Sequence, residues 1–411
     1  MKEFEKHSIV LLSLTMAGNI FNLLLQIIMG RMLDIGLFGT MNTLFSLSAI
    51  VSLPAYGIFL LTSKYVSEYS ALELSYKPIL KKMFFFTFVF VLFFLLLGIG
   101  LSGFIGSFFN IENSSLILLV IISAGVLFIL HVITGGLQGE KRFLALGIVG
   151  LLIPFTKLFG SIIFVSLGFE LFGILLSNLF GIILSILTGF WLLKLTFNYS
   201  DEKISFKINF KVLQYSLFTF FVTVILIILT NIDIIIVSQY FTAEETGFYS
   251  TASILCKSIF FISSSILFVM FPLVTEAAAK KTDTVKLLIK TFFYCGSLSA
   301  ACVLVFYFFS KPVITILFGS KYMNSIDYIL PVSIWIIGVM FITVFAHYSL
   351  AVNRAKHSSV SLFFICAACF VLPYFIHTDI SQIFYSLAAI SFGILGISIL
   401  LFFTNFAGRA K

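Results

Sequence analysis

The sequence has few charged residues and no long polar stretch. Of its 411 residues only 10% are Asp, Glu, Lys or Arg, whereas 60% are hydrophobic and the mean hydropathy is +1.16. Water-soluble domains contain about 25% charged residues, so a chain of this length would not have enough polar surface to fold in water. The composition excludes a soluble protein and predicts an integral membrane protein whose solvent is lipid.

Cysteine is absent from the first half of the chain, and all five cysteines lie at or after Cys256. Cys366 and Cys369 have the CxxC spacing of redox and metal sites, but they lie in an apolar run with no second pair nearby. We therefore interpret them as small buried side chains, and we expect no metal and no cofactor. A Walker-type phosphate loop is also missing, so the chain is not expected to hydrolyse ATP.

Apolar runs long enough to cross a bilayer occur twelve times, and they are continuous rather than alternating. About 20 apolar residues are needed for one helical crossing, and continuous runs predict helices rather than the strands of a barrel. The connectors between the runs are short, so the sequence has no room for a separate soluble domain. The predicted spans are 9–30, 38–61, 83–107, 115–137, 144–168, 171–196, 212–239, 247–273, 287–309, 327–352, 358–377 and 380–404.

The distribution of Lys and Arg predicts the topology. With a cytoplasmic N-terminus, 20 of the 25 basic residues lie on the inner side, 3 lie on the outer side, and 2 lie inside spans. Such a bias is the positive-inside rule, so both termini are expected to be cytoplasmic. The net charge of +8 is then explained by contact with anionic membrane lipids, and no nucleic-acid partner is expected. The first run has spanning length, so no cleavable signal peptide is predicted.

The two halves of the chain repeat each other. Asn19 and Arg142 are 123 positions apart, and so are Asn231 and Arg354, which gives an offset of 212 between the halves. An inner polar connector separates them, so the sequence predicts an N-lobe at 1–197, a cytoplasmic amphipathic linker at 198–211 and a C-lobe at 212–411. Six spans per half give both copies one orientation, which predicts pseudo-symmetry about the membrane normal and a central cavity.

Three segments of the sequence carry a resemblance to a known family. They are NIFNLLLQIIMGRMLDIGLFGTMN with its continuation TSKYVSEY, GGLQGEKRFLALG, and TNIDIIIVSQYFTAEETGFYSTASILCK running to LFVMFPLVTEA. In their order and twelve-span frame they resemble the polysaccharide (O-antigen) flippase branch of the multidrug/oligosaccharidyl-lipid/polysaccharide exporter superfamily. The resemblance implies an all-α, V-shaped protein of the bacterial inner membrane with two six-helix lobes.

The same resemblance implies a substrate. Such a protein would move an undecaprenyl-pyrophosphate-linked oligosaccharide from the cytoplasmic to the outer leaflet, with other polysaccharide-assembly proteins as possible partners. Two alternatives stay open, an ion-coupled drug exporter of the same superfamily and a membrane glycan polymerase. The polymerase is disfavoured because the sequence has neither a large extramembrane loop nor a carboxylate cluster, and the chain is not expected to be an enzyme.

Lys157 and Lys257 are the candidate substrate-binding residues inside the spans. A cation at the centre of a span costs about 2.5–3.5 kcal/mol on insertion scales, so each should face water or a partner. A pyrophosphate would repay this cost through charge-assisted hydrogen bonds. The alternative for each lysine is a carboxylate partner on a neighbouring helix.

Arg31, Lys64 and Asp233 complete the candidate site. Arg31 and Lys64 lie at span ends, where they would contact phosphate or serve as interfacial anchors. Asp233 is the one carboxylate well inside a span, and we predict that it binds a coupling cation, a proton or sodium, or else pairs with a lysine. His131 and His347 are expected to make helix-packing hydrogen bonds rather than a proton relay.

Overall fold

The computed structural model describes residues 2–193 and 210–407, apart from 73, 112, 281 and 353–354. Within these residues the chain forms fourteen α-helices and one short 3-10 helix, η1. The predicted linker at 198–211 lies almost entirely outside the described residues. The elements are α1 (Lys2–Met32), α2 (Ile35–Val51), α3 (Leu53–Ala71), α4 (Lys77–Phe108), α5 (Ser114–Gly139), α6 (Phe143–Ser166), α7 (Glu170–Leu193), α8 (Phe210–Leu229), α9 (Ile232–Tyr240), α10 (Ala243–Ala279), α11 (Val285–Leu317), η1 (Ser320–Ser325), α12 (Ile326–Ala351), α13 (Ala355–Phe375) and α14 (Ile380–Ala407).

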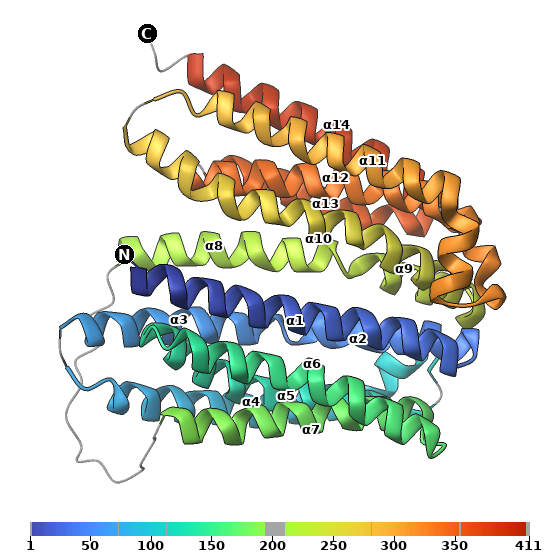
Figure 1. The fold of residues 1–411 in the computed structure, drawn as a ribbon, viewed down its shortest axis with the longest axis horizontal. Coiled ribbons are helices and arrows are strands. Elements are labelled where there is room, and N and C mark those ends of the chain that lie inside the picture. The colour runs from blue at the N-terminus through green and yellow to red at the C-terminus, as the bar shows by residue number, and fades with distance from the viewer. Residues whose placement is uncertain are drawn as a thin grey trace. The chain divides into compact units, whose positions relative to one another are not determined.

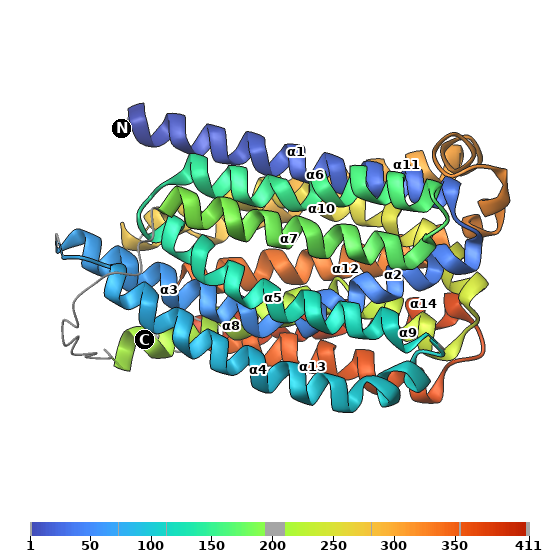
Figure 2. The same cartoon turned by 90° about the horizontal axis from the view of Figure 1, so that it is seen from below.

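The chain divides into two compact units, Met1–Asn209 and Phe210–Lys411, which we call the N-lobe and the C-lobe. Within each lobe the helices run side by side along one direction, as both views show (Figures 1 and 2). In the N-lobe, α5 packs against α3, α4 and α7, and α1 packs against α6. In the C-lobe, α12 packs against α10, α11 and α14, and α8 packs against α13. The two lobes therefore share one packing scheme.

The helices have the length and composition of membrane spans. Among the described residues, eight helices are long and apolar enough to cross a bilayer, or up to ten when each of two bent pairs counts as one span. The pairs are α2 with α3 and α8 with α9. Counting each pair as one segment, and including α10 and α13, leaves twelve helical segments, which confirms the predicted all-α membrane protein with twelve spans.

Both bent pairs break at residues that disturb helix geometry. The α2–α3 pair bends by 42° at Ser52, just before Pro54, which lacks the backbone N–H that would continue the helix. The α8–α9 pair bends by 43°, and there the carbonyl of Ile227 accepts side-chain hydrogen bonds from Thr230 and Asn231. These contacts satisfy a backbone oxygen near the end of α8.

Large apolar side chains cover the outside of α4. Phe85, Phe88, Phe93 and Phe104 are all exposed, although a soluble protein rarely shows a contiguous apolar surface of this kind. Helix α11 exposes Phe293, Phe308 and Ile316. These two helices occupy matching places in their lobes, and we assign their outer faces to lipid.

Two glycines let α5 approach α3 closely. A Cβ atom at Gly135 would lie 2.7 Å from the backbone oxygen of Phe59, and one at Gly139 would lie 2.7 Å from the backbone oxygen of Ser63. Small residues four positions apart are the usual means of bringing helix backbones together in membranes. The α3–α5 contact of the N-lobe therefore depends on residues without side chains.

Candidate functional site

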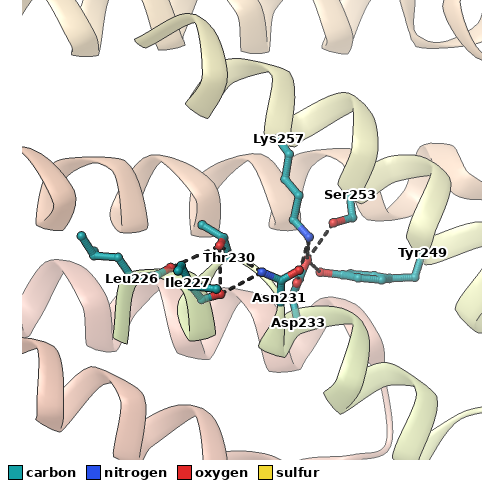
Figure 3. A network of polar contacts seen from close by, with 8 residues as sticks. All are labelled: Leu226, Ile227, Thr230, Asn231, Asp233, Tyr249, Ser253 and Lys257. Carbon is teal, nitrogen blue, oxygen red and sulfur yellow. Dashed lines mark hydrogen bonds and ion pairs between the residues drawn. The ribbon is translucent and has the colours of Figure 1, made fainter. Parts of the chain in front are cut away.

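Asp233 is the centre of a buried polar cluster in the C-lobe. It lies in the first turn of α9, directly after the bend, and its side chain is 0% exposed. Tyr249 donates a hydrogen bond to its Oδ2 at 3.0 Å, Ser253 donates to the same oxygen at 2.7 Å, and the Lys257 ammonium donates to Oδ1 at 3.0 Å. Lys257 Nζ is also 3.0 Å from Oδ2. Figure 3 shows the three donors converging on the carboxylate.

The three donors come from one face of α10. Tyr249, Ser253 and Lys257 are spaced four residues apart, and side chains at this spacing lie one above the other on a helix. The helix is anchored at its start by a capping box, in which Thr242 and Glu245 bond each other's backbone N–H groups. A fixed helix start and a regular spacing hold all three groups toward α9.

The Asp233–Lys257 pair is internally neutral. The Lys257 side chain is 16% exposed, so both charges are largely removed from solvent. Removing one partner of such a pair leaves a buried charge without compensation, which costs about 3–5 kcal/mol. Asp233 and Lys257 therefore stabilise each other inside the C-lobe and join α9 to α10.

Lys157 has a different environment in the N-lobe. It lies well inside α6, and its ammonium sits 3.4 Å from the centroid of the Phe45 ring on α2. Within the described part of the chain, its Nζ has no carboxylate partner. A cation over an aromatic face is attracted by the ring quadrupole, but the ring carries no net charge. Lys157 thus lies against an aromatic ring rather than an anion.

The two lobes differ at equivalent positions. The offset of 212 sets Asp233 against Phe21 and Lys257 against Phe45. Phe21 packs edge-on against Phe155 and Phe159 of α6, with ring centroids 5.8 and 6.3 Å apart. The N-lobe position that corresponds to the C-lobe carboxylate is therefore occupied by an aromatic cluster.

Arg31 and Lys64 lie at helix ends or on helix surfaces. Arg31 is exposed in the last turn of α1. Lys64 is on α3, where its ammonium is 4.0 Å from Glu68 one turn later and 5.5 Å from the ring centroid of Tyr65. Surface pairs of this kind contribute about 0–1 kcal/mol, so Lys64 can exchange its partner at little cost.

The two histidines repeat one arrangement. His131 is hydrogen-bonded through Nδ1 to the carbonyl of Leu127, and His347 to that of Thr343, both at 2.9 Å. His131 also packs edge-on against Phe59, and His347 packs in the same way against Phe271. Phe59 and Phe271 are 212 positions apart. The hydrogen bonds join each histidine to its own helix, whereas the sequence interpretation expected bonds between helices.

Three residues that contact the charged side chains were not predicted from the sequence: Tyr249 and Ser253 beside Asp233, and Phe45 beside Lys157. Tyr249 and Ser253 stand two turns and one turn before Lys257, and this spacing alone could have identified them as partners of the same carboxylate. Phe45 could not have been identified, because nothing in the sequence indicates which of 53 phenylalanines lies beneath Lys157.

The cysteines form no site within the described residues. All five are free, and Cys369 is buried while Cys366 is half-buried. No group of three or more His, Cys, Asp or Glu among the residues described could hold a metal ion.

Comparison with protein families gives one match over most of the chain. The family described as "Polysaccharide biosynthesis protein" matches residues 73–327, which is more than half of the sequence. No curated protein sequence matches the chain.

Solved structures of transporters have the same fold. The chain is 12% identical to a multidrug resistance MATE family transporter of the MOP superfamily in an inward-facing conformation, with a TM-score of 0.75, and the match covers 97% of this chain and 98% of the other. An outward-facing structure of a transporter so described is 14% identical with a TM-score of 0.62, covering 98% and 95%. A MOP superfamily transporter from Pyrococcus furiosus is 12% identical with a TM-score of 0.62, covering 99% and 96%.

Proposed function

The chain belongs to the polysaccharide biosynthesis protein family, and from this premise we propose that it is a lipid-linked glycan flippase. It moves an undecaprenyl-pyrophosphate-linked oligosaccharide from the cytoplasmic to the outer leaflet of the bacterial inner membrane by alternating access. Both termini are cytoplasmic in this proposal, and other polysaccharide-assembly proteins supply and consume the substrate. The superfamily resemblance predicted from the sequence is confirmed by the family match and by the shared fold.

The observation that carries the proposal is the position of Lys157, well inside α6 and without a carboxylate partner among the described residues. A cation inside a membrane span is costly unless water or a partner stabilises it, and within the described residues no carboxylate does so. An ammonium ion binds phosphate oxygens through charge-assisted hydrogen bonds. A transported molecule with a pyrophosphate group supplies the missing anion. Arg31 and Lys64 are the further cations proposed to contact it, whereas Lys257 is already paired with Asp233.

Asp233 remains the proposed site of ion coupling, with a proton or sodium as the coupling cation. Both of its oxygens already accept hydrogen bonds from Tyr249, Ser253 and Lys257. A coupling cation at this carboxylate must therefore take the place of the Lys257 ammonium. Unchanged flipping in vesicles after both ion gradients are collapsed would contradict coupling.

The proposed function is tested with purified protein in vesicles that contain an undecaprenyl-pyrophosphate-linked oligosaccharide. A membrane-impermeant glycosidase cleaves only the glycans exposed outside, so the cleavable fraction measures flipping. We expect this fraction to rise from about half toward completion with the protein, and to stay near half in protein-free vesicles. Equal cleavage in both preparations would contradict the proposal.

Drug export is the competing outcome, since similar folds include multidrug transporters. A site for cationic drugs would present acidic groups, whereas Asp233 is already paired with Lys257 and Lys157 is a basic residue. We therefore expect the same vesicles to take up no ethidium. Ethidium uptake without glycan flipping would favour the exporter.

A further inference from the structure

We infer that the two intramembrane lysines have different roles. Lys157, held on the face of Phe45, is the anion-binding site for the pyrophosphate of the lipid carrier, and Lys257 is a positioning residue committed to Asp233. The inference rests on the proposed function for the identity of the anion. Both lysines are predicted to lie near the middle of a membrane span, so their depth alone does not distinguish their roles.

The first step concerns the hydrogen-bonding capacity of Lys157. An ammonium group has three donors and no acceptor. The Phe45 ring, 3.4 Å from the ammonium, attracts the charge without supplying a lone pair. No hydrogen bond or ion pair of Lys157 Nζ is found among the residues that the structure describes. Its hydrogen-bond donors are therefore available to a phosphate.

The second step concerns access and position. Lys157 and Phe45 are each half-buried, so neither residue is fully enclosed by the lobe. The ring comes from α2 and the lysine from α6, so the contact fixes the end of a flexible side chain at a junction between helices. A pre-positioned cation loses less conformational freedom when it binds an anion than a mobile one would.

The third step concerns Lys257, whose ammonium group is already paired with a carboxylate. It binds both oxygens of Asp233 at 3.0 Å, and the same carboxylate is held by Tyr249 and Ser253. Binding a phosphate would pull the ammonium away and leave a fully buried carboxylate without a cation, which is strongly unfavourable. Lys257 therefore holds α9 against α10 rather than meeting the transported anion.

Binding measurements on the purified full chain separate the two roles. The probe is farnesyl pyrophosphate in detergent, titrated while the thermal midpoint of the protein is followed, with farnesol as the uncharged control for the tail and inorganic pyrophosphate as the control for a free anion. The variants are Lys157→Gln, Lys157→Arg, Phe45→Leu and the double variant D233N/K257Q, which removes both charges of the pair together.

We expect farnesyl pyrophosphate to stabilise the wild-type protein, farnesol to have no effect, and inorganic pyrophosphate to act more weakly because it lacks the tail. Lys157→Gln should weaken binding about tenfold or more, as expected for the loss of charge-assisted hydrogen bonds. Phe45→Leu should weaken it about two- to fivefold, because the charge remains but its support is lost. Lys157→Arg should retain binding, and D233N/K257Q should bind within about twofold of wild type because no part of the site is changed.

The inference is overturned if Lys157→Gln binds like wild type, or if D233N/K257Q loses as much affinity as Lys157→Gln. It is also overturned if the wild-type protein shows no response to farnesyl pyrophosphate. Failure of the proposed function would be seen in a different experiment. Vesicles would then show no glycan flipping, while the binding differences between the variants could still be measured.

Discussion

The two lobes pack their helices in the same way but place charge differently. In the C-lobe, Asp233, Tyr249, Ser253 and Lys257 form one polar cluster. The offset of 212 places apolar side chains at all four corresponding positions of the N-lobe, which are Phe21, Leu37, Met41 and Phe45.

The difference shows that packing and charge are independent features of the repeat. The His131–Phe59 and His347–Phe271 contacts recur in both lobes, so the helix scaffold is shared. The ionisable groups are not shared between the lobes. The C-lobe confines its charge within a neutral pair, whereas the N-lobe presents a cation on an aromatic ring.

The bends also differ between the lobes. In the N-lobe the second membrane segment is bent, at Ser52, and α1 is continuous, whereas in the C-lobe the first segment is bent, between α8 and α9, and α10 is continuous. Asp233 directly follows the C-lobe bend, so the ion pair holds the short helix α9 against the continuous helix α10.

The largest expected effect comes from breaking the C-lobe pair. Lys257→Gln leaves Asp233 buried without a cation and should destabilise the protein by about 3–5 kcal/mol. The thermal midpoint of the purified protein and the yield of monodisperse material in detergent measure this loss.

The matched control is the double variant D233N/K257Q, which should recover most of the lost stability because neither side chain is then charged. A double variant as unstable as Lys257→Gln would contradict the account of the pair as mutually compensating.

A smaller loss is expected in the N-lobe scaffold. Gly139→Ala places a Cβ atom 2.7 Å from the backbone oxygen of Ser63 and should cost about 1–3 kcal/mol through overpacking of α3 against α5. Gly103→Ala on α4 is the control, because nothing lies within 4 Å of its added Cβ. Equal thermal midpoints for the two variants would show that the α3–α5 contact does not depend on close approach.

Lys157→Gln should change the stability of the protein in the opposite direction to Lys257→Gln. Removing an uncompensated cation from a span removes an unfavourable group, so the protein should gain about 0.5–2 kcal/mol, the range of typical stabilising substitutions, while losing transport. Thermal midpoints of the two single variants, measured in one detergent, test this contrast. A loss of stability in Lys157→Gln would mean that Lys157 has a structural partner.

The smallest effect is expected at the histidines. Because each bonds a carbonyl of its own helix, His131→Leu and His347→Leu should each cost only about 0.5–1.5 kcal/mol, the net value of one hydrogen bond, and the two should agree closely. Flipping rates should stay near those of wild type. A strong loss of flipping in either variant would indicate a role in proton transfer instead.

The sequence predicted the features that depend on composition and periodicity. Twelve apolar runs and short connectors were enough for the all-α membrane fold, since a lipid solvent leaves few alternatives to spanning helices. The offset of 212 also matched the Phe59 and Phe271 positions. The division of α8 from α9 was not predicted, because the bend at Thr230 and Asn231 involves no proline.

The site was predicted only in part, for a physical reason. Lys257 and Asp233 were identified because charges are rare in spans, but their mutual contact was one of two readings left open. Whether a lysine meets a carboxylate or a ring is decided by tertiary packing, and Phe45 lies more than a hundred positions from Lys157 in the chain.

The most direct test compares glycan flipping in vesicles by Lys157→Gln and by D233N/K257Q, each reconstituted at the same protein density as wild type. With both ion gradients collapsed, so that coupling at Asp233 does not contribute to the rate, the account predicts that Lys157→Gln flips at least about tenfold more slowly than wild type, the effect of losing charge-assisted contacts. Under the same conditions D233N/K257Q flips at a rate close to wild type. Normal flipping by Lys157→Gln together with loss of flipping by a stably folded D233N/K257Q would contradict it.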